Sequence, residues 1–277
     1  GREIPDGAAE VLLVGNSYTQ ANNLETILHQ IITPSDSANV SSLSGGGMRL
    51  DQHASRMNTP SDQWNTTLSN NDLDWVVFQD QSQVPGFPRG HTNWQDSISG
   101  LFDLTTRVDD LGGESVLFMT WGYREGDSSN AERYPDYKTM QGHLRQGYED
   151  YSDNTSDSQS TTWIAPIGLA YENIYDGILN AGGNPLDSTS IFWNLYSGDG
   201  MHPSQTGSYL SACVIYSTIY GNTTAGQVDA TNIDSTTKLA LQQAADDTVF
   251  NGTFGYSFPW MAAGWDGPGD SENNSSE

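Results

Sequence analysis

Short apolar runs alternate along this chain with longer segments of helical periodicity. Most of these runs are rich in Val, Ile, Leu, Phe or Trp, and glycine or polar residues follow them. Runs of this kind, bounded by turn residues, are typical of strands that are buried on both faces. The predicted strands are residues 11–14, 39–43, 74–79, 115–121 and 161–167.

Between these runs, apolar residues recur every three or four positions, which is the spacing of one face of a helix. The first helix is predicted over 22–32, where positions 24, 27, 28, 31 and 32 are apolar. Strands that alternate with helices imply a mostly parallel sheet covered on both faces. The expected fold class is therefore α/β, a three-layer sandwich with a five-stranded sheet. Further helices are expected over 93–111, 133–152, from 168 onward, 204–220 and 234–249, with a helical or irregular connection over 49–70.

The chain of 277 residues has no repeat and no low-complexity linker, so one domain over residues 1–263 is expected. Residues 264–277 are mostly Asp, Glu, Asn, Ser and Gly. Such a segment has too few apolar side chains to pack against a core. We therefore expect this acidic tail to be disordered.

The composition is strongly acidic, with 35 Asp and Glu against 10 Lys and Arg, for a formal net charge of −25. The acidic residues are spread along the chain. A surface of this kind stays soluble where salt screens its self-repulsion, because the Debye length is about 3 Å at 1 M salt. The charge favours a halophilic protein, as in a haloarchaeon, over an ordinary acidic secreted protein. Nucleic acid is not an expected partner, because no basic patch is present to neutralise phosphates.

A single cysteine, Cys213, excludes an internal disulfide and a cysteine-based metal site. It lies in an apolar run and is expected to be buried. No window approaches the roughly 18 apolar residues of a membrane span. The chain begins with Gly1 rather than Met, so we expect that the original N-terminus was removed. Several possible glycosylation sequons slightly favour a secreted or cell-surface location over the cytoplasm.

A polar turn, Gly15-Asn16-Ser17, ends the first predicted strand and precedes the first helix. Open α/β sheets bind their ligands at this carboxyl edge of the strands, so Ser17 is a candidate nucleophile there. Unpaired backbone N–H groups and the helix dipole would favour negative charge at this place. The alternative is that Asn16 or Ser17 only caps the helix.

A second polar motif, Asp199-Gly200-Met201-His202, lies in a loop just before the helix predicted over 204–220. A carboxylate three residues before a histidine can accept from one imidazole nitrogen and leave the other to take a proton from a serine. Serine needs such a base, because its hydroxyl is a weak nucleophile at its free pKa. Taken alone, the pair is also compatible with a cap or a surface contact.

Together, the early Gly15-Asn16-Ser17 block and the late Asp199…His202 block resemble those of the SGNH hydrolase superfamily, the GDSL-like esterases. The resemblance extends in block order over residues 10–220. It implies a flavodoxin-like sheet, a catalytic triad of Ser17, His202 and Asp199, and ester hydrolysis through an acyl-enzyme. It implies no cofactor.

The inner blocks indicate donors for an oxyanion hole. The backbone N–H of Ser17 is one, and the family's second block supplies a glycine N–H, for which Gly46 or Gly47 is in the right place. The third block usually contains Gly-x-Asn, whose amide is a further donor. Here a glutamine amide stands at the corresponding place, with Gln79 the first choice and Gln81 the second. Some SGNH carbohydrate esterases carry Gln at this block, so an O-acetyl ester on carbohydrate is the favoured substrate.

Substrate contacts are expected from Asn16, Trp121 and Tyr123, because the latter two follow a strand at the same edge. Core packing is an equally good interpretation of Trp121. Two further functions stay open: a lipid esterase or thioesterase with the same triad, and a non-catalytic carbohydrate-binding protein that kept the fold. No metal site is expected, because the remaining histidines have no partners at ligand spacing.

Overall fold

A five-stranded parallel sheet forms the centre of the structure, a computed structural model that describes residues 8–33, 37–69, 73–226, 229, 231–262 and 265. The strand order is β2-β1-β3-β4-β5, and all four neighbouring pairs are parallel. The predicted α/β class is confirmed, and the sheet is parallel throughout. The strands are β1 (Ala9–Gly15), β2 (Ala38–Ser44), β3 (Trp75–Phe78), β4 (Glu114–Phe118) and β5 (Trp163–Ala165).

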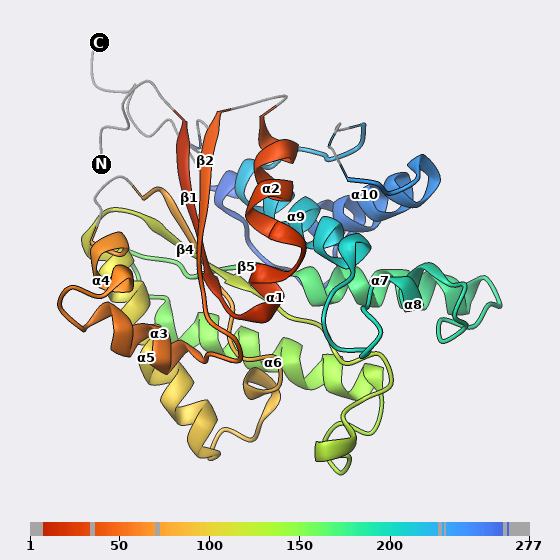
Figure 1. The fold of residues 1–277 in the computed structure, drawn as a ribbon, viewed down its shortest axis with the longest axis horizontal. Helices are drawn as coiled ribbons and strands as arrows, with labels where there is room; N and C mark the ends of the chain where they lie inside the picture. The colour runs from red at the N-terminus through yellow and green to blue at the C-terminus, as the bar shows by residue number, and fades with distance from the viewer. Residues whose placement is uncertain are drawn as a thin grey trace.

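Helices connect the strands and cover both faces of the sheet (Figure 1). Short 3₁₀ turns η1 (Ala21–Asn23), η2 (Val84–Gly86), η3 (Ser128–Asn130) and η4 (Pro259–Met261) lie between them. Each helix predicted from periodicity has a counterpart, and the connection over 49–70 contains two short helices. The helices are α1 (Ser17–Gln20), α2 (Leu24–Ile32), α3 (Leu50–Met57), α4 (Gln63–Thr67), α5 (Thr92–Asp110), α6 (Tyr137–Thr155), α7 (Ile167–Asn180), α8 (Ile191–Asn194), α9 (Gln205–Tyr220) and α10 (Ser235–Phe250).

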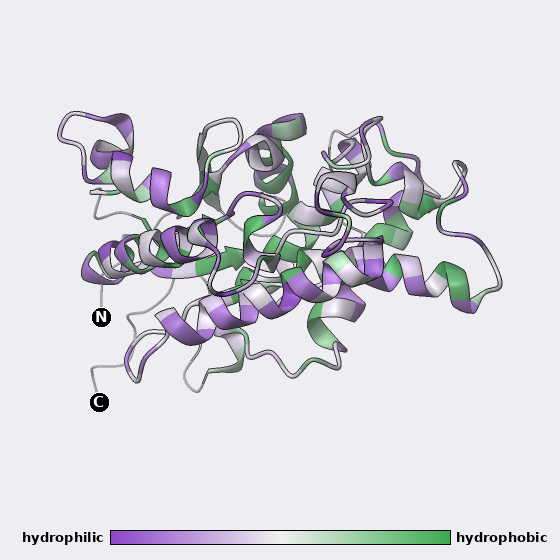
Figure 2. Cartoon of the chain, turned by 90° about the horizontal axis from the view of Figure 1, so that it is seen from below, coloured by the Kyte–Doolittle hydropathy of each residue, from purple (hydrophilic) through white to green (hydrophobic). Residues whose placement is uncertain are grey.

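Successive side chains of each strand point to opposite faces of the sheet, and both faces are apolar. Val11 and Leu13 of β1 pack in one core with α2, α9 and α10. Leu12 and Val14 pack in the other core with α3, α5 and part of α6. Figure 2 shows the apolar residues gathered at the sheet in the middle, with hydrophilic residues along the outer helices. Burial on both faces explains why the central strands β1 and β3 read as continuous apolar runs, whereas the edge strand β2 exposes Asn39 and Ser41.

The most deeply buried helix is α9, in which every residue from Gly207 to Tyr220 is buried. Cys213 lies inside this helix and is buried, as predicted. Because α9 packs against α2, α10 and α7, its N-terminal end is firmly placed. The loop with Asp199 and His202 runs directly into that end.

The strand order puts β1 between β2 and β3. The connection from β1 to β2 therefore crosses one face of the sheet, and the connection from β2 to β3 crosses the other. In parallel α/β sheets, this switch point opens a crevice at the carboxyl ends of the strands. The register pairs Gly15 with Ser44, and Val14 with Phe78. The turns that follow β1, β2 and β3 therefore meet at one place.

Two expectations concern the chain's ends and its relation to membranes. The predicted acidic tail lies outside the described residues, apart from Trp265. Within the described ranges, no helix combines the length and the apolar character needed to cross a membrane.

Candidate active site

The turn after β1 holds Ser17 at the start of α1. Asn16 caps this helix, because its side-chain oxygen accepts from the backbone N–H of Tyr18 at 3.1 Å. The capping interpretation is therefore right for Asn16, while the side chain of Ser17 remains half-exposed and contacts another residue. Gly15 is needed here, since an added Cβ would lie 2.1 Å from the hydroxyl oxygen of Thr19.

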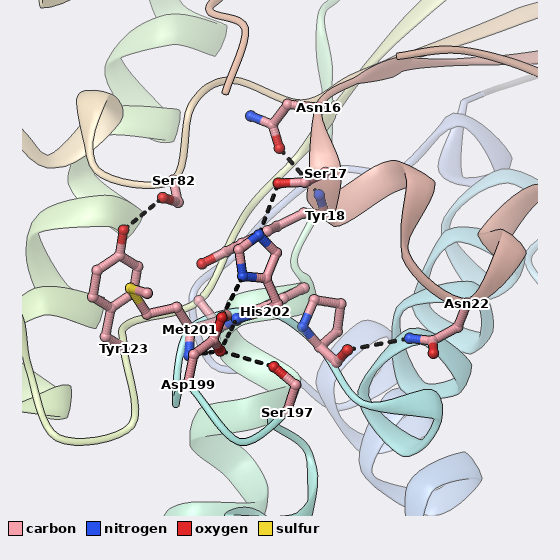
Figure 3. A network of polar contacts seen from close by, with 12 residues as sticks. Asn16, Ser17, Tyr18, Asn22, Ser82, Tyr123, Ser197, Asp199, Met201 and His202 are labelled. Carbon is pink, nitrogen blue, oxygen red and sulfur yellow. Dashed lines mark hydrogen bonds and ion pairs between the residues drawn. The ribbon is translucent and has the colours of Figure 1, made fainter. Parts of the chain in front are cut away.

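Ser17, His202 and Asp199 meet across the carboxyl edge of the sheet, although Ser17 and His202 are 185 residues apart (Figure 3). Ser17 Oγ lies 2.9 Å from His202 Nε2, and His202 Nδ1 lies 2.6 Å from Asp199 Oδ2. The second carboxylate oxygen of Asp199 accepts from Ser197 Oγ and from the N–H groups of Met201 and His202, at 2.8, 2.9 and 3.0 Å. The carboxylate is thus held at the edge of the imidazole ring opposite to the edge that contacts Ser17.

These contacts keep Asp199 ionised. Burial by itself would raise the pKa of Asp199, but the hydrogen bonds from the Met201 N–H, the His202 ring, the Ser197 hydroxyl and the His202 N–H hold it well below its ordinary value. The side chains of His202 and Asp199 are each 39% exposed. Solvent, and a small substrate, can therefore reach the imidazole.

Trp121 belongs to the core and is not a substrate platform. Its side chain is 0% exposed and lies between two parallel rings, Tyr18 at 4.8 Å and Tyr171 at 4.4 Å between centroids. The indole N–H donates to the carbonyl of Met201 at 3.1 Å. Tyr18 in turn meets His202 edge-on at 5.2 Å. The expected substrate contact of Trp121 is wrong, because Tyr18 and Tyr171 cover both faces of the indole. The indole instead supports the loop that carries His202.

The other residues after β4 are also buried. Tyr123 is 7% exposed, and its hydroxyl lies 2.8 Å from Ser82 Oγ beside the triad (Figure 3). Its ring therefore does not form an open platform. Arg124 is 6% exposed, stacks over Trp193 at 3.4 Å and donates its backbone N–H to the carbonyl of Gly200 at 2.9 Å.

Asn16 is 2% exposed and does not face a substrate. Its amide nitrogen donates to the carbonyl of Met48 at 3.1 Å and to that of Asp80 at 3.3 Å. These two carbonyls belong to the turns after β2 and β3. The expected substrate contact is therefore corrected: Asn16 ties together the three turns that build the site.

Gln79 is 0% exposed and lies against the turn after β1 that carries Ser17. Its amide oxygen accepts from the Asn16 N–H and from Thr19 Oγ1, each at 3.0 Å, and its amide nitrogen donates to the carbonyl of Asp80. This placement contradicts its assignment as an oxyanion donor, because every polar atom of the amide has a buried partner. Gln81 is half-buried, and its amide donates within its own loop.

Asp80 was not predicted to contribute, yet it joins β3 to the helices around the site. The carboxylate accepts from the N–H of Leu50, the hydroxyl of Ser97 and the hydroxyl of Tyr151, at 3.2, 3.1 and 2.9 Å. These partners lie on α3, α5 and α6. Burial raises the pKa of Asp80 to about 6, against the opposing effect of these hydrogen bonds.

Gly46 and Gly47 lie in the exposed turn that follows β2 and runs beside the end of β1. The preceding N–H, that of Gly45, donates to the carbonyl of Gly15 at 3.2 Å and fixes the turn beside β1. Gly47 has a φ of 67°, which favours glycine. Within the described residues, the N–H groups of Gly46 and Gly47 have no hydrogen-bond partner.

His53 is a buried structural histidine. Its Nδ1 accepts from the indole N–H of Trp64 at 2.8 Å, and burial lowers its pKa to about 4. The ring is therefore neutral at physiological pH. In the described part of the chain, no three His, Cys, Asp or Glu side chains gather as a metal site.

Two residues that form hydrogen bonds in the site, Ser197 and Asn22, were not predicted from the sequence. Ser197 stands two residues before Asp199, close enough for a hydroxyl to reach the carboxylate, so a local signal was present. Asn22 donates its side-chain amide to the carbonyl of Pro203 at 3.2 Å. The only signal for Asn22 was the pair Asn22-Asn23, since asparagine tolerates left-handed backbone better than most residues.

The fold recurs in solved structures, while no protein-family model and no curated protein matches the chain. A DUF4886 family protein from Bacteroides uniformis is 18% identical, with a TM-score of 0.67, and the match covers 88% of this chain and 95% of that one. A protein from Slackia heliotrinireducens, described as a proposed SGNH hydrolase, is 23% identical, with a TM-score of 0.56, over 76% and 97% of the two chains. The chain therefore has an SGNH-like fold. At these identities the likeness concerns the fold alone.

Proposed function

We propose that this chain is a serine hydrolase of the SGNH type that cleaves short-chain esters. The observation that carries the proposal is the hydrogen-bonded series Ser17–His202–Asp199, with distances of 2.9 and 2.6 Å. A serine becomes a useful nucleophile when a base lies within such reach and a third group orients the base. Exposed pairs of this kind contribute little to stability, so their alignment is better explained by chemistry.

In the proposed reaction, Ser17 Oγ attacks the ester carbonyl while His202 Nε2 takes the hydroxyl proton. Asp199 accepts from Nδ1–H throughout, which fixes the tautomer and stabilises the imidazolium. The tetrahedral intermediate then expels the alcohol, which receives the proton from His202. Water, deprotonated by the same nitrogen, attacks the acyl-enzyme carbonyl. The second tetrahedral intermediate then breaks its bond to Ser17 Oγ, which takes the proton back from His202 as the carboxylic acid leaves.

The developing oxyanion would be held by the backbone N–H of Ser17 and by that of Gly46 or Gly47. This assignment uses groups that are exposed beside Ser17 and have no partner among the described residues. One such donor is typically worth about 10²–10³ in kcat. Gln81 is kept as a further proposed donor, because its half-buried amide nitrogen carries two N–H groups and donates to Gln83 with one of them.

An acetyl ester on a carbohydrate is the proposed substrate. The support is the resemblance of the Gln-bearing third block to that of SGNH carbohydrate esterases.

Replacement of the nucleophile tests the proposal. Ser17→Ala should lower kcat/KM for p-nitrophenyl acetate by about 10⁴–10⁶, because the attacking oxygen is removed. Ser41→Ala is a matched control, since Ser41 is an exposed serine on β2 away from the site. Turnover that survives in Ser17→Ala would refute the mechanism.

The alternatives are separated by the choice of substrate and by covalent labelling. Acetylated sugars should be hydrolysed faster than long-chain esters; the reverse order would indicate a lipid esterase. An organophosphonate should label Ser17 in the wild type and not in Ser17→Ala. Absence of labelling in the folded wild type would indicate a carbohydrate-binding protein without activity.

A further inference from the structure

The loop that carries His202 is held by hydrogen bonds to its backbone carbonyls. The carbonyl of Met201, just before the histidine, accepts from the indole N–H of Trp121 at 3.1 Å. The carbonyl of His202 itself accepts from the N–H of Ser197 at 2.8 Å. The first of these contacts comes from the core and the second from the loop. Neither directly joins the loop to the segment that carries Ser17.

A third contact makes that connection. The amide nitrogen of Asn22 donates to the carbonyl of Pro203 at 3.2 Å, and to the hydroxyl of Ser208 at 2.9 Å. Pro203 follows His202 directly, and Ser208 is buried in the first turns of α9. Asn22 lies only five positions after Ser17 on the same short segment. Figure 3 shows its side chain turned toward the chain after His202.

The backbone at Asn22 is unusual in a way that serves this contact. Asn22 and Asn23 both have left-handed conformations, with φ values of 57° and 56°. Residues other than glycine seldom adopt this region, and asparagine is among those that tolerate it best. The two residues close the 3₁₀ turn η1 between α1 and α2, and Asn23 is the N-cap residue of α2, which lies within the helix predicted over 22–32. Uncommon backbone of this kind is often retained next to functional sites.

We propose that Asn22 is a positioning residue that sets the distance between Ser17 Oγ and His202 Nε2. It does so by fastening the backbone after the histidine to the segment that carries the nucleophile. The inference rests on the proposed function, because it concerns the geometry of the same reaction. Without the amide, the carbonyl of Pro203 loses its link to that segment, and the 2.9 Å contact between serine and imidazole is no longer fixed from this side.

Asn22→Gly and Asn23→Gly form a matched pair of variants. Both replace an exposed asparagine in left-handed conformation by the residue that best accepts it, so neither strains the backbone. Only the first removes the donor to Pro203. Since a displacement of about 1 Å can cost about 10²-fold in rate, kcat for p-nitrophenyl acetate should fall about 10- to 100-fold in Asn22→Gly, with KM nearly unchanged. Asn23→Gly should keep the wild-type kcat.

Two further measurements separate positioning from general loss of structure. The second-order rate of Ser17 labelling by an organophosphonate should fall by the same factor as kcat, although the denaturation midpoint stays far above the assay temperature. Asn22→Asp keeps the size and the left-handed preference but has no donor, so it should resemble Asn22→Gly rather than the wild type.

Wild-type kcat in Asn22→Gly would overturn the inference while the proposed function stands. A loss of kcat equal in both glycine variants, or one that follows the folded fraction, would also overturn it. If the wild type itself shows no turnover that depends on Ser17, the proposed function fails first. That result is read from the Ser17→Ala comparison and does not depend on Asn22.

Discussion

Replacement of Gln79 by Met tests whether this side chain supports the nucleophile turn or acts on the oxyanion. Met has nearly the same length and volume, so little cavity is left and the surrounding packing is kept. What is removed is the pair of hydrogen bonds that the amide oxygen accepts from the Asn16 N–H and Thr19 Oγ1, each at 3.0 Å, and the one donated to Asp80. The substitution thus isolates the polar role of the side chain.

The expected loss of stability follows from burial. Asn16 is 2% exposed and Thr19 is 2% exposed, so neither donor can find water when its acceptor is gone. A buried donor left without a partner costs about 1–3 kcal/mol, and the hydroxyl of Thr19 can rotate while the backbone N–H cannot. We expect the free energy of unfolding to fall by about 2–4 kcal/mol, from a total that is about 5–15 kcal/mol in single domains.

Urea denaturation of the wild type, Gln79→Met, Thr19→Val and the double variant measures this loss and the coupling between the two residues. Because Thr19→Val removes a bond that Gln79→Met has already broken, the two losses should not add, and a coupling of about 0.5–1.5 kcal/mol is expected. An unchanged unfolding midpoint with kcat lowered by about 10²–10³ would refute the reasoning. That outcome would mean that the amide faces the oxyanion after all.

Two further predictions concern pH and salt. Burial lowers the pKa of His53 to about 4, below its unfolded value of about 6.5, so the unfolded chain binds the proton first as the pH falls. The contribution of His53 to stability is therefore fully present above about pH 6.5 and is lost toward pH 4, at about 1.4 kcal/mol per unit. Urea denaturation of the wild type and His53→Gln at a series of pH values should show this slope in the difference between their free energies of unfolding. Asp80 has the opposite effect on stability, but it is present in both proteins, so its effect cancels in the difference. Free energies of unfolding that change in parallel with pH would contradict the prediction. With 35 acidic and 10 basic residues, the thermal midpoint should rise from about 0.1 to 1 M NaCl, as the Debye length shrinks from about 10 to 3 Å, and a midpoint that falls would argue against the halophilic proposal.

The predictions that hold are those that depend on residues close together in sequence. The apolar runs and the helical spacings gave the strands and helices because burial on one or two faces repeats with the period of the element itself. Asp199 and His202 are three residues apart, so a loop conformation is enough to bring them within 2.6 Å. The resemblance in block order added the partner at Ser17, which periodicity alone could not supply.

The helix expected over 22–32 is confirmed as α2, Leu24–Ile32, the stretch over which the apolar spacing runs. It begins two residues later than expected because Asn22 and Asn23 have left-handed backbone, and hydropathy carries no information about φ. The left-handed pair is retained where the amide of Asn22 can reach Pro203, a residue 181 positions away. The local sequence allows that conformation, and the contact with the distant loop selects it.

The sequence by itself determined the α/β class, the order of its elements and the two blocks that carry Ser17 and His202. Only the tertiary structure decided which polar and aromatic side chains near those blocks face the solvent. Gln79 and Trp121 both follow strands at the edge of the site, yet both are fully buried, because partners 50 or more positions away cover them. A strand's pattern fixes the direction in which a side chain leaves the sheet, whereas its exposure depends on what distant elements place in front of it.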